Sequence, residues 1–179
     1  MKRLPYTDAF VDESVRGQRY RMACVLVHAR HLAGVRQSTG ALAGQSKRLH
    51  FHQELASTRR TVLDQFAAMP VRANVVVCAR SHGVSEFHAR DACLAEIVRQ
   101  LQAQSVSRLT IESRQDDRDD RRTIARSREA EPSLVFDHRE GAREPLLWIA
   151  DAVAWAFGAG GRWLTLVGPL IDVVTELRP

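Results

Sequence analysis

Three carboxylates stand in the sequence where an ionised side chain is costly. Asp12 and Glu13 close the apolar run of residues 9–11, and Asp151 is the only charged residue among residues 146–157. Burial of an ionised carboxylate is unfavourable unless the group is paired, hydrated or bound to a cation. Mg²⁺ binds through carboxylates and waters, and two-metal phosphoryl-transfer sites collect carboxylates from distant parts of a chain. The residue types therefore predict a site for Mg²⁺ or Mn²⁺ that hydrolyses phosphodiesters of DNA or RNA.

The neighbours Asp12 and Glu13 are expected to face opposite sides of the first strand. Successive side chains of a strand alternate, so Asp12 shares a face with Phe10 and Ser14, while Glu13 points the other way with Val11. One carboxylate can then face a site that its neighbour cannot reach. The alternative is an acidic turn with no role in binding.

Asp151 is expected on an apolar face of a buried helix. Leu147 lies four residues before it and Trp155 four residues after it, so all three share one helical stripe. An arginine partner or a backbone cap is the alternative account of this aspartate. Glu112 ends a later predicted strand and is the third expected ligand beside Asp12 and Asp151.

The candidate site residues fall into three groups. The predicted metal ligands and catalytic residues are Asp12, Glu112 and Asp151; the second rank of acids is Glu13, Glu54 and Asp116; the predicted nucleic-acid contacts are Arg114, Arg118 and His50. A proton shuttle is assigned to His50 or His52, with a structural role as the alternative. Most of the charged run 115–128 is expected to be a solvated loop and an exposed helix start.

The expected elements make an α/β fold. Strands are predicted over residues 9–11, 22–27, 48–52, 73–79, 107–113 and 134–137, and helices over residues 57–69, 85–104 and 146–157, with a short helical piece at 31–36. The first three strands are expected to pair as an antiparallel meander, and helical crossovers make the later strands parallel. The apolar residues 163–174 either close the core or form a homodimer.

Composition limits the class of protein. The 179 residues are 45% hydrophobic and 26% charged, which is typical of one soluble domain spanning residues 1–179. The net charge of +5 is carried almost wholly by arginine, whose planar fork suits phosphate, so a nucleic-acid partner is permitted. Three scattered cysteines, no leader and no apolar stretch long enough to cross a membrane predict a cytoplasmic protein.

Three stretches together resemble the bacterial domain-of-unknown-function family 3800. They are FVDES at residues 10–14, Glu-Ser-Arg at residues 112–114 and Ala-Asp at residues 150–151. The resemblance implies a ribonuclease H-like fold: a mixed sheet of about five strands, antiparallel over the first three and then parallel, flanked by helices. It also implies acidic residues around a Mg²⁺ or Mn²⁺ site, with Asp12, Glu112 and Asp151 as the matching acids.

The sequence departs from that family at three places. Glu112 stands where aspartate is usual, and Val15 stands where glycine is usual. The strand over residues 73–79, expected beside the first strand and expected to carry an acid, has none. The last departure favours a second hypothesis, a non-catalytic ribonuclease H-like module that binds nucleic acid or a protein partner.

Overall fold

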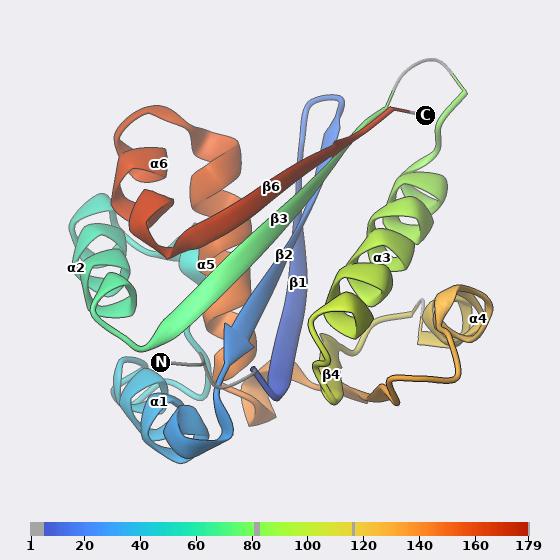
Figure 1. The fold of residues 1–179 in the computed structure, drawn as a ribbon. Coiled ribbons are helices and arrows are strands. Elements are labelled where there is room, and N and C mark those ends of the chain that lie inside the picture. The colour runs from blue at the N-terminus through green and yellow to red at the C-terminus, as the bar shows by residue number, and fades with distance from the viewer. Residues whose placement is uncertain (1–5, 81–82, 116, 179) are drawn as a thin grey trace.

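A mixed six-stranded sheet forms the centre of the protein (Figure 1). The computed structural model describes residues 6–80, 83–115 and 117–178. The strands are β1 (Asp8–Arg16), β2 (Arg19–Val27), β3 (Val71–Ala79), β4 (Arg108–Glu112), β5 (Val135–Arg139) and β6 (Ile171–Leu177), in the spatial order β5-β4-β1-β2-β3-β6.

Helices connect most of these strands. They are α1 (Ala29–Ala41), α2 (Ala56–Ala67), α3 (Glu86–Ala103), α4 (Asp117–Ser127), α5 (Leu146–Ala159) and α6 (Gly161–Val167), with short 3₁₀ turns η1 (Phe51–Gln53), η2 (Gly141–Arg143) and η3 (Gly168–Leu170). The predicted helices over 57–69, 85–104 and 146–157 correspond to α2, α3 and α5. The piece predicted at 31–36 is the middle of the longer helix α1.

The strand directions follow from the lengths of the connections. A two-residue turn at Gly17, where φ is 59°, joins β1 to β2 as an antiparallel hairpin. The strands β4 and β5 run parallel to β1, as their helical crossovers require. The prediction of antiparallel and then parallel strands is therefore confirmed for these four elements.

The third strand was predicted in the wrong place. Residues 48–52 form a loop and the turn η1, in which Leu49 and Phe51 are buried against the helices and pair with no strand. The third strand is β3, which is antiparallel to β2 and does not lie beside β1. Alternation over five residues describes a segment with one buried side, and it does not establish strand pairing. A sixth strand, β6, then pairs with β3 in parallel.

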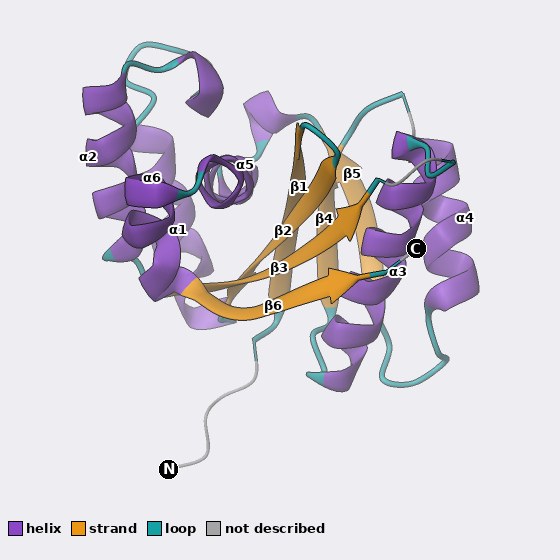
Figure 2. Cartoon of the chain, turned by 90° about the horizontal axis from the view of Figure 1, so that it is seen from above, coloured by secondary structure: helices purple, strands orange, loops and turns teal. Residues whose placement is uncertain are grey.

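Helices cover both faces of the sheet (Figure 2). The helices α1, α2, α5 and α6 lie on one face, and α3 and α4 lie on the other. Phe10 belongs to the hydrophobic cluster under α5, whereas Val11 belongs to the cluster under α3. The predicted alternation along β1 is confirmed, so Asp12 and Glu13 leave the same strand towards different layers.

The helix ends of the α5 layer are set by local chemistry. The carboxylate of Glu144 accepts a hydrogen bond from the Leu146 backbone N–H at 3.2 Å, as an acid at the positive end of a helix is expected to. Gly160, with φ of 67°, ends α5 and begins the turn into α6. Nine of the fourteen residues of α5 are buried, which confirms its predicted place in the core.

The apolar C-terminal segment packs on its own sheet. Val167 and Leu170 are buried in the cluster under α5, and the following residues form β6. The segment closes the core, and no observation supports the predicted homodimer. Within the described ranges, no helix combines the length and apolar character that a membrane span needs.

Candidate active site

The acids predicted from distant parts of the chain converge on the α5 side of the sheet. Val11 of β1 pairs in register with Ile111 of β4, so Asp12 and Glu112 stand side by side at the next position of each strand. Both side chains are buried, with Asp12 only 1% exposed. Asp151 reaches the same place from α5 and interacts electrostatically with both of them.

Asp12 carries a proton far more readily than an ordinary aspartate. Burial raises its pKa well above the usual value, and the charges of Glu13, Glu112 and Asp151 raise it further. A hydrogen bond joins Asp12 to Glu112, with Asp12 as the protonated partner. Four carboxyl groups therefore share too little positive charge for Asp12 to ionise easily.

Glu112 keeps its charge although it is buried. Burial by itself raises the pKa of Glu112, but hydrogen bonds from Arg48 and Asp12 and the charges of Arg48 and Arg114 outweigh it and lower the pKa. The pKa values of two neighbouring acids are thus shifted in opposite directions. Such a division is common at sites where an enzyme handles protons.

Asp151 is held by the loop that was predicted to be a strand. Burial raises the pKa of Asp151, and the charge of Glu112 adds to this shift. The charges of Arg48 and His52 and a hydrogen bond from the Phe51 backbone act in the opposite direction. The alternative account, in which an arginine and a backbone donor satisfy this aspartate, is therefore part of the observed structure.

Two arginines touch the acidic cluster. Arg48 forms an ion pair with Glu112. Arg114 bridges three acids: its guanidinium lies 2.7 Å from Glu13, 3.1 Å from Asp12 and 3.6 Å from Glu112. Arg114 was predicted to contact nucleic acid, and it lies at the site with 43% of its side chain exposed. Arg48 was missed because no motif marks an arginine in a loop.

A glycine makes room for the Arg48–Glu112 pair. A Cβ placed on Gly141 of η2 would collide with the Arg48 guanidinium and the Glu112 carboxylate. The Gly141 carbonyl accepts a hydrogen bond from the indole N–H of Trp148 at 2.6 Å, which ties this turn to α5. Only a residue without a side chain permits that close approach.

Glu13 points to the α3 side, where it joins a second network that Arg114 links to the first. Its carboxylate lies 2.8 Å from Arg90 of α3, and Arg90 also binds both oxygens of Asp120 at 2.8 Å. The Tyr20 hydroxyl accepts from the same guanidinium at 3.2 Å. Hydrogen bonds from His138 and Arg90 lower the pKa of Asp120 in spite of its burial. The predicted catalytic role of Glu13 is therefore less favoured than a structural one.

Asp117, Asp120 and His138 form a compact group of possible metal ligands. One ligand atom from each lies within 4.8 Å of the others, and no other such group of three occurs in the part of the chain that the structure describes. These atoms already have partners: Asp117 accepts from the Ser113 hydroxyl at 2.7 Å, and His138 lies 3.1 Å from Asp120. Since Arg90 holds both oxygens of Asp120, the group is better explained as a hydrogen-bonded brace.

That brace was missed because the charged run was expected to face solvent. Asp120 is only 2% exposed, and Thr123 and Ile124 are buried beside it. Spacings of three and four residues place these side chains on one helical face. The apolar Ile124 was the signal that could have indicated a buried face on α4.

A cavity of about 390 Å³ opens at the carboxyl ends of β4 and β5. Its described lining consists of Ser113, His138, Arg139, Glu140 and Arg143. Glu112 directly precedes Ser113, so the cavity adjoins the acidic cluster along the chain. In α/β sheets, ligands commonly bind outside the carboxyl ends of the parallel strands.

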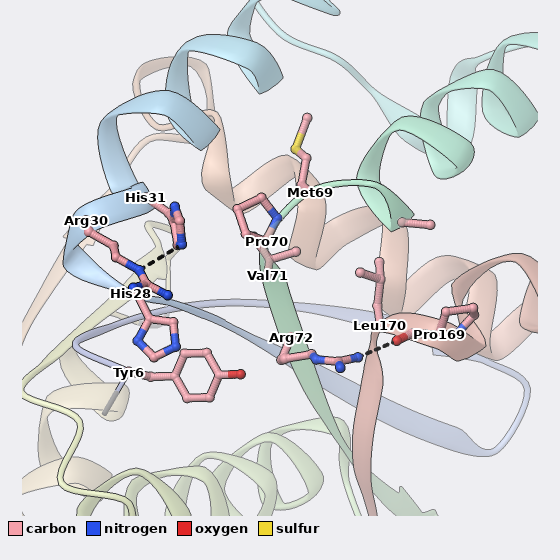
Figure 3. A pocket seen from close by; sticks show the side chains of 11 residues that line it. Tyr6, His28, Arg30, His31, Met69, Pro70, Val71, Arg72, Pro169 and Leu170 are labelled. Carbon is pink, nitrogen blue, oxygen red and sulfur yellow. Dashed lines mark hydrogen bonds between the residues drawn. The ribbon is translucent and has the colours of Figure 1, made fainter. Parts of the chain in front are cut away.

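A second cavity, of about 340 Å³, lies at the opposite end of the sheet (Figure 3). Tyr6 precedes β1 there and stacks on His28 with ring centroids 4.3 Å apart. Arg72 donates to the Pro169 carbonyl at 2.6 Å on the other side of the cavity. None of the predicted site residues lines it, so this cavity plays no part in the acidic site.

The remaining predicted residues lie outside the centre of the cluster. Glu54 follows η1 and is half-buried, with no hydrogen bond or ion pair to the acids among the described contacts. His50 is exposed, and it is His52 whose charge affects Asp151. Arg118 is exposed on α4. Asp116 lies outside the described residues.

The donor chemistry of Asp12, Glu112 and Asp151 suits a hard divalent cation, although their ligand atoms do not all lie within 4.8 Å of one another. Asp12, Glu112 and Asp151 offer carboxylate oxygens, the donors that Mg²⁺ and Mn²⁺ prefer. Burial and the charges of the neighbouring acids raise the pKa of Asp12, and a bound cation would stabilise its ionised form. Mg²⁺ usually keeps several waters and takes one or two protein carboxylates, so all three acids need not bind it directly.

No family model matches the chain, and no curated protein matches it. A solved structure of a mutant of Bst-RNase HIII aligns with 92% of this chain and 62% of its own chain, at 11% identity and a TM-score of 0.43. The chain thus spans less than two thirds of that protein. At this level of similarity the alignment assigns neither an activity nor a substrate.

Proposed function

We propose that the protein is a divalent-metal-dependent nuclease that hydrolyses phosphodiester bonds of DNA or RNA. The observation that carries the proposal is the convergence of Asp12, Glu112 and Asp151 from β1, β4 and α5, with the pKa of Asp12 raised by burial and by its acidic neighbours. Separate elements place three acids on one face of a sheet.

The finer assignment is a ribonuclease H-like fold, as the resemblance to family 3800 implies. The strands β1 to β5 support it. The pairs β1–β2 and β2–β3 are antiparallel, β4 and β5 run parallel to β1, and helices cover both faces. The acid that the resemblance leads us to expect on residues 73–79 is absent: these residues belong to β3, which carries no acid and is separated from β1 by β2. Glu112 of β4, which pairs with β1, is the acid already matched to the later strand.

The residues at the site would have different roles in the reaction. Asp12, Glu112 and Asp151 would hold Mg²⁺ or Mn²⁺, which supplies Lewis-acid stabilisation of the phosphate and an activated water. Glu112 and Asp12 sit within hydrogen-bond reach of each other, so they can pass a proton between them. Arg139 and Arg143 beside the cavity would contact phosphate oxygens through their planar forks.

Calorimetry with Mn²⁺ tests the metal site directly. We expect the wild-type protein to bind Mn²⁺ and Asp12→Asn and Asp151→Asn to lose the binding while both remain folded. Cleavage of fluorescent single-stranded and double-stranded DNA and RNA should require Mn²⁺ or Mg²⁺ and should fail in both variants. Metal-dependent cleavage that survives in folded Asp151→Asn would contradict the proposed mechanism.

A second candidate is a non-catalytic module that binds nucleic acid or a protein. The ion pairs of Arg48 and Arg114 with the acids favour it, because arginine can neutralise a cluster without metal. This candidate predicts no Mn²⁺ binding that depends on Asp12, and nucleic-acid binding without cleavage. The calorimetric titration separates the two.

A further inference from the structure

We infer that an arginine–tryptophan surface formed by α2, α5, α6 and the end of β1 binds single-stranded nucleic acid beside the acidic cluster. The surface consists of Arg16, Arg59, Arg60, Trp155, Arg162 and Trp163. The inference rests on the proposed function for its link to hydrolysis, while the binding itself needs no metal.

A cavity of about 520 Å³ forms the centre of this surface. Arg60 of α2 and Arg162 and Trp163 of α6 line it, together with the polar side chain of Ser57. Its size falls within the range of about 300–1,000 Å³ that is typical of ligand pockets. The helices α2 and α6 lie next to each other in both views (Figures 1 and 2), so the cavity is a feature of their contact.

The tryptophan rings connect the cavity to the acids. Trp163 meets Trp155 edge-on with centroids 5.5 Å apart, and Trp155 meets Phe51 at 5.4 Å. The Phe51 backbone in turn donates to Asp151. Trp155 lies one helical turn after Asp151 on α5, about 6 Å along the axis. The helix that carries Asp151 therefore also contributes an aromatic ring to this surface.

Guanidinium groups cover the same aromatic rings. Arg59 lies over Trp155 at 4.4 Å, Arg16 lies over it at 5.3 Å, and Arg162 lies over Trp163 at 4.7 Å. Nucleobases stack on both indole rings and arginine planes, and this stacking tolerates any base sequence. The surface thus offers stacking partners in the pattern that single-strand binding proteins use.

The charge of the surface is uncompensated. None of the ion pairs found among residues 6–80, 83–115 and 117–178 involves Arg16, Arg60 or Arg162. No aspartate or glutamate occurs in the described lining of the cavity either. An anionic ligand with flat apolar groups matches this combination, and a nucleic-acid strand has both properties.

Fluorescence anisotropy with short labelled single-stranded DNA and RNA in EDTA tests the inference. We expect binding by the wild-type protein, and a loss of at least tenfold in the exposed double variant Arg60→Glu/Arg162→Glu. For a single strand, each lost phosphate contact lowers the slope of log K against log salt by about 0.7, so the double variant should lower it by about 1.4. The matched control is Arg99→Glu/Arg121→Glu on α3 and α4, which changes the net charge equally and should bind as the wild type does.

Stacking is tested separately from charge. A strand with abasic sites should bind about 5- to 150-fold more weakly per stacked base, because base–aromatic stacking contributes that much. Intrinsic tryptophan fluorescence should be quenched by the intact strand and less by the abasic one. Trp163→Ala should remove the difference, and circular dichroism checks that this variant folds.

Three outcomes would overturn the inference. These are no binding in EDTA at low salt, equal losses in the surface variant and the control, and displacement of the strand by polyglutamate of equal charge, which would indicate an acidic protein partner. Binding without any metal-dependent cleavage would refute the nuclease and leave this surface intact, so the two proposals fail independently.

Discussion

Asp12 and Glu13 are neighbours on one strand, yet their surroundings differ in a way that separates chemistry from structure. On the α3 side, Glu13 shares Arg90 with Asp120, and every charge has an opposite partner within hydrogen-bond distance. On the α5 side, burial raises the pKa of Asp12, and the charges of Glu13, Glu112 and Asp151 raise it further, although Arg114 lies 3.1 Å away. The two sides therefore differ in how fully positive charge balances the buried acids.

The comparison indicates which acids can act. A carboxylate saturated by arginine stabilises the fold and has no free oxygen for a ligand. A buried carboxyl whose ionised form is disfavoured stores unfavourable energy, which binding of a cation can release. Ionisable groups with strongly shifted pKa values concentrate at functional sites for this reason. The α5 side is therefore the better place to look for activity.

The largest expected loss of stability comes from removing Arg90, the cation shared by the acids on the α3 side. Arg90→Met leaves Glu13 and Asp120 buried without their shared cation and should cost about 3–5 kcal/mol of unfolding free energy. Urea denaturation measures the loss. The control Arg99→Met removes an exposed pair with Glu96 and should cost less than about 0.5 kcal/mol. A loss below about 1 kcal/mol for Arg90→Met would show that the network does not brace the fold.

The next largest loss of stability is expected from Gly141→Ala, which tests the close packing around the Arg48–Glu112 pair. In Gly141→Ala, the new methyl group meets the Arg48–Glu112 pair, and the protein should lose about 1–3 kcal/mol through overpacking. Gly34→Ala in α1 is the control, since a Cβ there meets nothing within 4 Å and alanine favours a helix. Thermal unfolding should separate the two variants, and equal melting temperatures would contradict the structure around η2.

Removing charge from the acidic side should stabilise the protein. The pKa of Asp12 is raised in the folded state, so wild-type stability falls as the pH rises through the interval between the unfolded and folded pKa values. Asp12→Asn avoids that loss and keeps a donor for Glu112. It should therefore be about 0.5–2 kcal/mol more stable than the wild type at neutral pH in EDTA. The difference should vanish at a pH below the unfolded value.

Urea denaturation across a range of pH in EDTA checks whether Asp12→Asn is more stable than the wild type. Asp119→Asn on the surface of α4 serves as control and should change stability by less than about 0.5 kcal/mol. Saturating Mn²⁺ should then reverse the order, because a ligand at 100 times its dissociation constant stabilises the wild type by about 2.7 kcal/mol. Asp12→Asn that is less stable than the wild type in EDTA would show that Asp12 is compensated after all.

The smallest stability effect belongs to the residue that joins the two sides. Arg114 contacts Asp12 and Glu13 but is 43% exposed, so Arg114→Gln should cost less than about 1 kcal/mol. Loss of its positive charge should strengthen Mn²⁺ binding by about 1 kcal/mol, or fivefold, measured by calorimetry. Unchanged affinity would mean that Arg114 does not compete with a cation for the acids.

The local pattern predicted much of the scaffold. The alternation in residues 10–14 placed Asp12 and Glu13 on opposite faces, and the apolar run around Asp151 predicted the buried helix α5. Both inferences depend only on neighbouring residues, whose geometry a strand or helix fixes. The strand assigned to residues 48–52 failed because pairing depends on a partner elsewhere in the chain.

By itself, therefore, the sequence determined which residues are apolar, acidic or helical and which side chains share a face. Only the tertiary structure decided that β4 and not β3 lies beside β1, which places Glu112 next to Asp12. It also decided that Arg48 approaches Glu112 and that Arg90 binds Asp120. Charge compensation acts through space between residues far apart in the chain, and no periodicity along the sequence encodes it.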